Sequence, residues 1–227
     1  NKLVYGTFSI DKPAFAFSAA DNALQISTLS AQLAGAPFAV KGSLSFDETQ
    51  ARLPYALSAQ AGLQSLELGN FMKRSDGNPI IDGKFSMQGQ LANRGANITH
   101  LLETLQGSLA LESTQGTLYL LANQSSDAVQ AISGLAGIAN AFLGRSTGNV
   151  AGLSSLMNLL NAIHYDNFSA QVTRGGDLDI VLQKLVIKGN EAMISGTGRV
   201  SYLDDVALTS WPMRIDAQLF VRGGIVR

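Results

Sequence analysis

The sequence predicts a β-dominated α+β fold, built on one long, twisted, mostly antiparallel sheet that curls into a trough or groove. Apolar and polar residues alternate with a period of two over most of the chain, which is typical of strands with one covered face. Glycine occurs 23 times and often stands where one alternating run ends. An insert at 127–163, in which Asp127 and Arg145 are the only charged residues, interrupts this alternation, and it predicts two uncharged amphipathic helices before a C-terminal β-meander.

Composition sets limits on the function. The chain has 227 residues, enough for one large domain or two small ones, and a net charge of −1. It carries no basic field that would attract nucleic acid. It has no cysteine, which excludes disulfides and thiolate metal sites. No apolar run reaches the roughly 18 residues of a membrane-spanning helix. The chain begins at Asn1 without an initiator Met, and we read it as a fragment or a processed form.

The N-terminal region, 1–73, is expected to consist of strands. The alternation predicts them at residues 3–10, 14–19, 23–33, 36–46 and 52–60. Asp11, Lys12 and Pro13 suggest a turn between the first two strands. Residues 66–73 suggest a turn or a short helical piece. The turn formers at 74–79 mark the predicted boundary to a second region, 78–227, although one continuous domain, 1–227, is the alternative.

Alternation resumes at Ile81. The side chains of Phe85, Met87, Gly89 and Leu91 are predicted to share one face of a strand. Asn97 is a predicted N-cap for a helix over 98–105, because its side chain can accept a hydrogen bond from the first helical turn. Gly107 is predicted to end that helix, and a strand over 108–121 follows.

The insert 127–163 contains two segments with helical spacing of apolar residues. These segments are 128–143 and 150–163, and neither contains Asp, Glu, Lys or Arg. Their polar faces consist of Ser, Asn, Gln and Gly. We therefore expect two amphipathic helices that pack against the sheet or cap one of its ends.

The C-terminal part is predicted to be a meander of hairpins. Two-residue turns are expected at Gly175-Gly176, Gly189-Asn190 and Asp204-Asp205. This spacing leaves strands of about 11–12 residues, or roughly 36–40 Å. Apolar residues change parity within 178–188, which predicts a bulge. Pro212 predicts that the last strand lies at an edge.

The residues that could carry chemistry favour structural roles. His100 and His164 are the only histidines, and neither has further ligands at metal spacing. The serines lack the G-x-S-x-G pattern of a nucleophile elbow. Gly196-Thr197-Gly198 lies inside an alternating strand without a following helix, so a bend or a close backbone approach is the better interpretation. We expect no enzyme, no cofactor and no metal.

The apolar face of the predicted sheet has two interpretations. It is either an ordinary core covered by the helices of the insert, or an open groove that holds acyl chains. Burying a CH₂ group contributes ~0.8 kcal/mol in both cases, so energetics alone does not separate them. The candidate lipid-binding residues are Phe38, Val40, Leu44, Phe85, Met87, Leu109, Leu111, Ile194, Val200, Trp211, Met213 and Ile215.

The spacing of glycines and apolar residues over about 78–221 resembles the C-terminal region of the AsmA-like family. The features that carry this resemblance are Gly83-Lys84-Phe85-Ser86-Met87-Gln88-Gly89, the helix 98–105 ending in Leu105-Gln106-Gly107, Leu109-x-Leu111, Gly116-Thr117-Leu118, Phe168-Ser169-Ala170-Gln171, Leu182 and Ile194-Ser195-Gly196-Thr197-Gly198. The helical insert 127–163 separates the two halves of this pattern.

The resemblance implies a non-enzymatic envelope protein of a diderm bacterium, related to TamB-like lipid-transfer proteins. Such a protein would work in the periplasm in lipid transport or outer-membrane biogenesis. It would be anchored to the inner membrane through a segment absent from this chain. Its expected partners are phospholipid or another acyl lipid, and envelope proteins, but not nucleic acid. The alternative is a structural or adhesive β-module of the cell surface, with a closed core, that binds protein or glycan through its loops.

Overall fold

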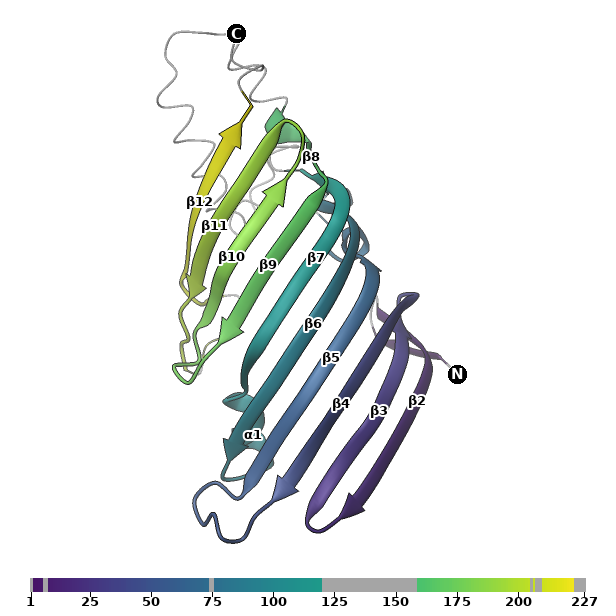
Figure 1. The fold of residues 1–227 in the computed structure, drawn as a ribbon, viewed down its shortest axis with the longest axis vertical. Helices are drawn as coiled ribbons and strands as arrows, with labels where there is room; N and C mark the ends of the chain where they lie inside the picture. Colours follow the sequence, from purple (N-terminus) through teal and green to yellow (C-terminus); the bar gives the residue numbers. More distant parts are fainter. Residues whose placement is uncertain are drawn as a thin grey trace.

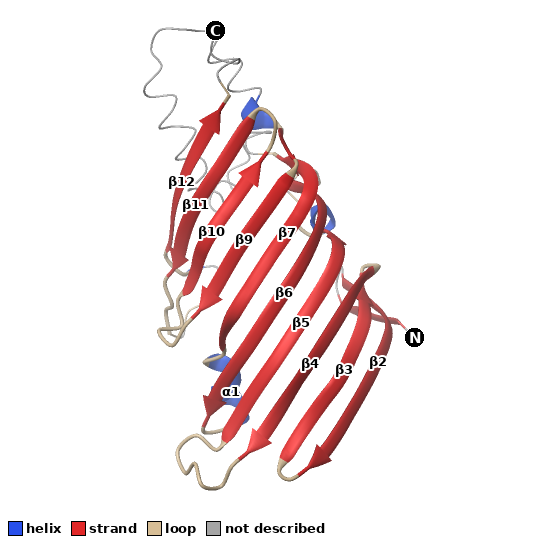
Figure 2. Ribbon diagram, in the orientation of Figure 1, coloured by secondary structure: helices blue, strands red, loops and turns tan. Residues whose placement is uncertain are grey.

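One antiparallel sheet makes up most of the protein. The structure, a computed structural model, describes residues 2–5, 8–73, 76–119, 159–204, 206 and 210–222, with the backbone alone up to residue 9. Within these residues, twelve strands form a single sheet (Figure 1). The β-dominated fold predicted from the alternation is confirmed, and the helices with described bounds are two short ones (Figure 2).

The strands follow one another across the sheet nearly in chain order. The N-terminal strands are β1 (Lys2–Tyr5), β2 (Phe8–Ala20), β3 (Ala23–Leu33), β4 (Ala36–Phe46) and β5 (Tyr55–Glu67). The central and C-terminal strands are β6 (Ile81–Gly95), β7 (Gln106–Leu118), β8 (Ile163–Tyr165), β9 (Asn167–Arg174), β10 (Ile180–Lys188), β11 (Ala192–Val200) and β12 (Met213–Val221). β7 pairs with both β8 and β9, and all the other neighbours in the sheet are consecutive in the chain.

Two short helices connect strands. The 3₁₀ helix η1 (Leu68–Asn70) lies where a turn or short helical piece was predicted. The helix α1 (Ile98–Glu103) begins after Asn97, whose side-chain oxygen accepts a 2.8 Å hydrogen bond from the His100 N–H, so the predicted N-cap is confirmed. Its predicted end at Gly107 is wrong, because Gly107 lies inside β7. A side chain there would overlap the Gln90 carbonyl of the adjacent strand.

The predicted turn at Asp11–Pro13 is also wrong. β2 runs through these residues, and the register to β3 shifts between Asp11 and Ala14. Lys12 has a φ of 51°, in the left-handed region. These turn-forming residues therefore produce an irregularity within a long strand. Sheets tolerate Pro at irregular positions of this kind.

The sheet continues across the polar segment 74–79. β5 and β6 flank this segment and pair from Tyr55 opposite Gly95 to Glu67 opposite Lys84. With 15 residues, β6 is the longest strand and spans about 50 Å. The described backbone on the two sides of the segment thus belongs to one continuous sheet.

The C-terminal meander has the predicted strand order but different turns. Residues 175–179 separate β9 from β10, and 201–212 separate β11 from β12, so these connections are longer than two residues. Leu178 takes a φ of 62°, and its N–H donates a hydrogen bond to the Gly175 carbonyl. Residues that were expected to begin the next strand therefore belong to the turn. The strands β9 to β12 are consequently 8 or 9 residues long and not 11–12.

Two finer predictions for the meander are confirmed. The register of β10 shifts between Leu182 and Leu185, where the parity change predicted a bulge. β12, which follows Pro212, pairs only with β11 among the described strands and lies at the edge of the sheet.

Most of the predicted helical insert lies outside the described residues. This applies to the segment 128–143 and to residues 150–158 of the second segment. Residues 159–161 are helical, in agreement with the prediction for that part. Ile163, expected in the same helix, instead begins β8 and pairs with Leu118.

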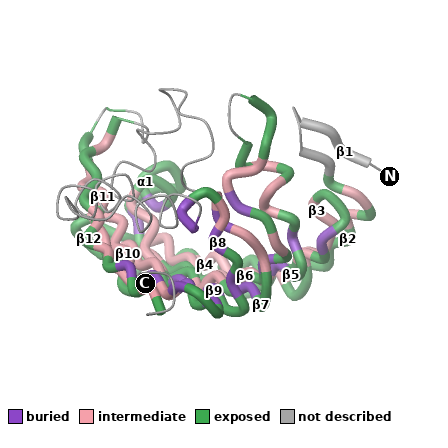
Figure 3. The backbone as a smooth tube through the Cα atoms, turned by 90° about the horizontal axis from the view of Figure 1, so that it is seen from above, coloured by how far each residue is buried: buried purple, intermediate pink, exposed green. Residues whose placement is uncertain are grey.

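The main hydrophobic core lies on one face of the sheet, near β8. We call the end of the sheet at β8 the β8 end, and the end at α1 the α1 end (Figure 1). Viewed along the sheet, the backbone is curved (Figure 3). The buried core residues are Ile81, Phe85, Leu118, Leu159, Leu160, Ile163, Tyr165, Phe168, Ala170, Ile187, Ala192, Ile194 and Leu219. Among the described residues, no helix has the length and apolar character needed to cross a membrane.

Candidate functional site

Strand register gathers the apolar side chains on one face of the sheet. A row that crosses five neighbouring strands, from β4 to β9, consists of Phe38, Leu63, Met87, Leu111 and Ala170. Residues directly opposite in adjacent strands project to the same side, and successive residues of one strand project to opposite sides. This row therefore defines an apolar face that is continuous across strands distant in sequence.

The opposite face is polar. A row three residues farther along each strand, and therefore on the other side, consists of Lys41, Gln60, Gln90, Ser108 and Thr173, again one residue from each of the same five strands. A shallow hollow of about 540 Å³ lies on this side, and glutamines from β5, β6, β9 and β10 contribute to its lining. The sheet is thus amphipathic over its whole middle part.

The candidate lipid-binding residues that lie in strands all share the apolar face. The strand registers place each of them in one of five rows across the sheet, which contain Phe38, Val40, Leu44, Phe85 and Val200. Trp211 differs, because it precedes β12. Its indole N–H donates to the Val206 carbonyl at 2.9 Å, and its ring stacks edge-on against Tyr202.

Near β8, the apolar face is a closed core. Phe85 is 0% exposed and Ile194 is 1% exposed, and Leu159 and Leu160 pack in the same cluster. Leu111 packs against this cluster as a partly buried residue. The candidate residues Phe85, Leu111 and Ile194 thus have the environment of a protein core and not of an accessible groove.

The middle of the same face is hollowed and accessible. A hollow of about 410 Å³ lies between the core and the α1 end, and it includes the candidate residues Phe38, Met87 and Leu109. Leu109 is 41% exposed. The other apolar side chains that line the hollow are Leu33, Ala61, Leu63, Leu91, Leu105, Val172 and Ile180.

Helix α1 covers the apolar face of β6 at the α1 end. Leu101, which is buried, lies directly over Gly95, where a Cβ atom would meet it at about 2.7 Å. The Asn93 amide, which projects from the apolar face of β6, donates to the Leu101 carbonyl at 3.0 Å and to the Thr104 hydroxyl at 2.7 Å. One glycine and one amide therefore hold α1 against the sheet.

Arg174, at the end of β9, is the charged residue in the lining of the hollow. Its Nη2 donates to the Glu103 carbonyl at 3.0 Å, its Nη1 to the Leu105 carbonyl at 3.1 Å, and its Nε to the Leu178 carbonyl at 3.2 Å. The guanidinium thus ties the end of α1 to the β9–β10 turn, and it does so from the apolar face.

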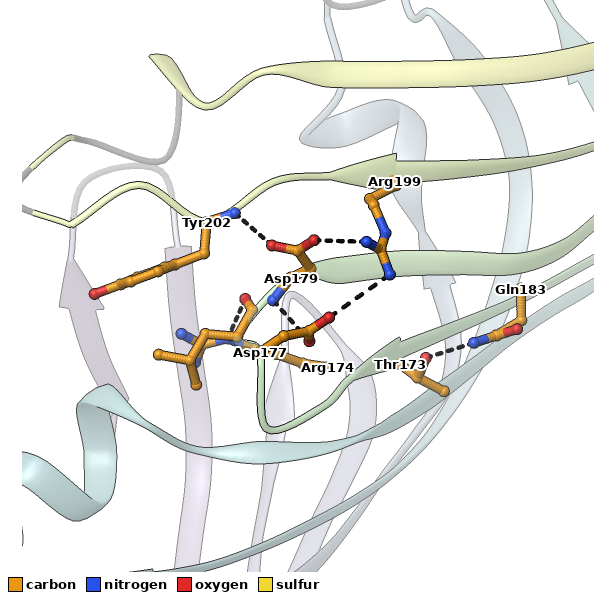
Figure 4. A network of polar contacts seen from close by, with 8 residues as sticks. Thr173, Arg174, Asp177, Asp179, Gln183, Arg199 and Tyr202 are labelled. Carbon is orange, nitrogen blue, oxygen red and sulfur yellow. Dashed lines mark hydrogen bonds and ion pairs between the residues drawn. The ribbon is translucent and has the colours of Figure 1, made fainter.

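A separate polar network surrounds this turn (Figure 4). The Arg199 guanidinium pairs with the Asp179 carboxylate at 3.1 Å and with the Asp177 carboxylate at 3.6 Å. Asp179 also accepts a 2.8 Å hydrogen bond from the Tyr202 N–H. Both carboxylates of the turn are therefore engaged by Arg199 and not by Arg174.

The apolar face extends beyond the hollow to the N-terminal edge of the sheet. Phe15 and Phe17 are 69% and 65% exposed, and their rings stack with centroids 6.2 Å apart. A register shift in β2 places both rings on the apolar face, opposite Leu29 and Ile26. Leu44 lines a further hollow of about 360 Å³ near the β2–β3 turn.

The remaining candidate residues lie around these sites. Val40 lies two residues from Phe38 in β4 and projects to the same face. Val200, Met213 and Ile215 lie on that face in β11 and β12. Met213 is exposed.

In the part of the chain that the structure describes, no three His, Asp or Glu residues come together as metal ligands. His100 is exposed in α1, and His164 in β8 lies 3.0 Å from the Thr117 hydroxyl. Burial raises the pKa of Tyr165 above its ordinary value of 10.0.

Part of the hollow was not predicted from the sequence. Strand parity placed Leu91 on the same face as Met87, although Leu91 was not among the candidate residues. Leu63 follows the same alternation as Leu57, so strand parity could have identified it. Arg174 carries no such signal. Its position depends on the pairing of β7 with β9, whose paired residues are more than 50 positions apart in the chain.

Comparison with known proteins does not assign the chain. No family model, no curated protein and no solved structure matches it.

Proposed function

We propose that this chain is a non-enzymatic lipid-handling module that shields acyl chains on the apolar face of its sheet. The observation that carries this proposal is the accessible apolar hollow between the buried core and α1, lined by Phe38, Met87 and Leu109. Ligand sites in proteins have volumes of about 300–1,000 Å³ and mostly apolar linings. The 410 Å³ of the hollow falls in that range.

Exposure of large apolar side chains supports the same function. Leu109 and Leu91 in the hollow, and Phe15 and Phe17 beyond it, lie on one face although they are in contact with solvent. Removing apolar surface from water contributes about 25 cal/mol per Å². Contiguous exposed apolar surface of this kind is typical of sites that bind a ligand, a protein or a membrane.

The shape of the sheet supports a trough. The curvature seen along the sheet in Figure 3, and the amphipathic faces defined by register, would let acyl chains lie along the apolar side while headgroups stay in water. We therefore propose that the sheet is a curled trough and that the uncharged helices pack near it.

We propose an envelope role of the AsmA-like kind on the resemblance over 78–221. The protein would then work in the periplasm of a diderm bacterium, in lipid transport or outer-membrane biogenesis, with anchoring supplied by a segment outside this chain. The structural or adhesive β-module remains the competing function. It requires a closed core and predicts a protein without extractable lipid.

The first test is native mass spectrometry of the protein purified from a bacterial host, followed by organic extraction. Lipid at a fixed stoichiometry is the expected result. A stable, lipid-free protein would contradict the proposal and favour the structural module.

A matched pair of variants connects any lipid with the hollow. Leu109→Asp places a charge on the apolar face, whereas Phe220→Asp places one on the opposite face at a similarly exposed position, 49% against 41%. We expect Leu109→Asp to remove most of the bound lipid and Phe220→Asp to retain it. Equal lipid in both variants would contradict binding at the hollow.

A further inference from the structure

We propose that Arg174 makes the apolar hollow selective for acyl lipids with an anionic headgroup. This inference rests on the proposed function and names the class of lipid. The arrangement that suggests it is a guanidinium held by three carbonyl oxygens at the rim of an otherwise apolar hollow.

The charge of Arg174 is not neutralised by its own neighbours. Its three partners are the carbonyl oxygens of Glu103, Leu105 and Leu178, which are neutral groups. The nearest carboxylates in sequence, on Asp177 and Asp179, pair with Arg199. Among the described residues, no salt bridge connects Arg174 to a carboxylate.

The guanidinium also keeps donors for a ligand. Arg has five N–H groups in a planar fork, and the three carbonyls take one each from Nε, Nη1 and Nη2. One N–H on each terminal nitrogen is left by these bonds. The oxygens of a phosphate or a carboxylate are suitable acceptors for guanidinium N–H groups. The carbonyl bonds hold the fork in place before any ligand arrives.

Burial energetics then favour an anionic lipid. An acyl chain placed in the hollow would remove water from around Arg174, and desolvating an unpaired charge is unfavourable. An anionic headgroup at the rim would offset that cost by pairing with the guanidinium. A zwitterionic headgroup brings its own cation to the same place, so its net attraction to Arg174 is weaker.

To test this, the purified protein is incubated with vesicles made of equal parts phosphatidylglycerol and phosphatidylethanolamine. Phosphatidylglycerol is anionic, and phosphatidylethanolamine is zwitterionic. Bound lipid is extracted from the re-isolated protein, and each class is quantified per protein. The ratio of phosphatidylglycerol to phosphatidylethanolamine bound to the wild type should be roughly three- to tenfold higher than the ratio in the vesicles, as expected for a partly exposed charge-assisted pair. The enrichment should fall in 0.5 M salt.

Three variants assign the effect to Arg174. Arg174→Gln should bind the two lipids at the vesicle composition, and Arg174→Lys should keep part of the enrichment because it retains the charge. Arg199→Gln is the matched control, since it removes an arginine charge on the opposite face beside the same turn. It should leave the enrichment unchanged.

The outcomes separate the two proposals. Absence of bound lipid in the wild type would overturn the proposed function. Bound lipid at the vesicle composition, or an enrichment that Arg199→Gln removes as strongly as Arg174→Gln, would overturn only the role of Arg174. If Arg174→Gln does not fold, the salt dependence of the wild type and the Arg174→Lys variant still decide the question.

Discussion

The Tyr165 hydroxyl donates a 2.7 Å hydrogen bond to the Asp82 carbonyl, a contact between residues 83 positions apart in the chain. Tyr165 lies in β8, Asp82 lies in β6, and β7 runs between them. The tyrosine side chain therefore crosses over β7, and it passes above Gly116 on the way. Phe85 and Phe168 pack around the same ring, so this contact closes the core at the β8 end.

Replacing Gly116 by Ala should destabilise the protein, because the added methyl group would overlap both the Asp82 carbonyl oxygen and the Tyr165 hydroxyl. We expect a loss of about 1–3 kcal/mol in the free energy of unfolding, measured by urea denaturation. Gly62→Ala is the control, since the nearest atom to its Cβ would be 4.0 Å away. Equal stability of the two variants would show that Tyr165 does not cross at Gly116.

Tyr165 should make the protein sensitive to alkaline pH. Burial raises its pKa above 10.0, so the folded state keeps the phenol proton at a pH where the unfolded chain has lost it. The stability from this group is complete below pH 10 and declines as the pH rises from there through the folded-state pKa. Thermal melting points measured between pH 8 and 11 should show this decline, and Tyr165→Phe should flatten it. A wild-type curve parallel to that of Tyr165→Phe would contradict the assignment.

Asp179 should contribute more to stability than its neighbour Asp177. Its side chain is 14% exposed and accepts the Tyr202 N–H as well as pairing with Arg199, whereas that of Asp177 is 54% exposed and lies farther from Arg199. Asp179→Ala should cost about 1–3 kcal/mol, because it leaves a partly buried N–H without an acceptor. Asp177→Ala should cost less than about 1 kcal/mol. Chemical denaturation of the two variants compares them directly, and the reverse order would refute this reading of the network.

Asn93 should determine how firmly α1 is held against the sheet. Asn93→Ala removes both hydrogen bonds from the amide to α1, with an expected cost of about 1–2 kcal/mol. Amide hydrogen exchange should become faster in α1 and at the start of β7, while the core near Phe85 keeps its protection. Arg94→Ala, one position away on the other face, is the control. Unchanged exchange in α1 would mean that the packing of Leu101 and the contacts of Arg174 hold the helix without Asn93.

Local sequence patterns determined most of the strands, the order of the C-terminal meander and the apolar face of the sheet. The limits of β3 and β4, the Asn97 cap and the bulge in β10 depend on alternation and on side chains a few residues apart. Such features can be read from the chain because strand periodicity and helix capping act over short distances.

Only the tertiary structure decided where the apolar face is covered and where it is open. Phe85 and Leu109 follow the same alternation on neighbouring strands, yet one is 0% exposed and the other 41% exposed. The difference arises because Leu160 and Tyr165, from a distant part of the chain, pack near Phe85, while α1 covers the opposite end of the sheet. The position of Arg174 at the hollow depends likewise on long-range pairing. Alternation identifies which side of a strand is apolar, but burial depends on which other elements reach that side.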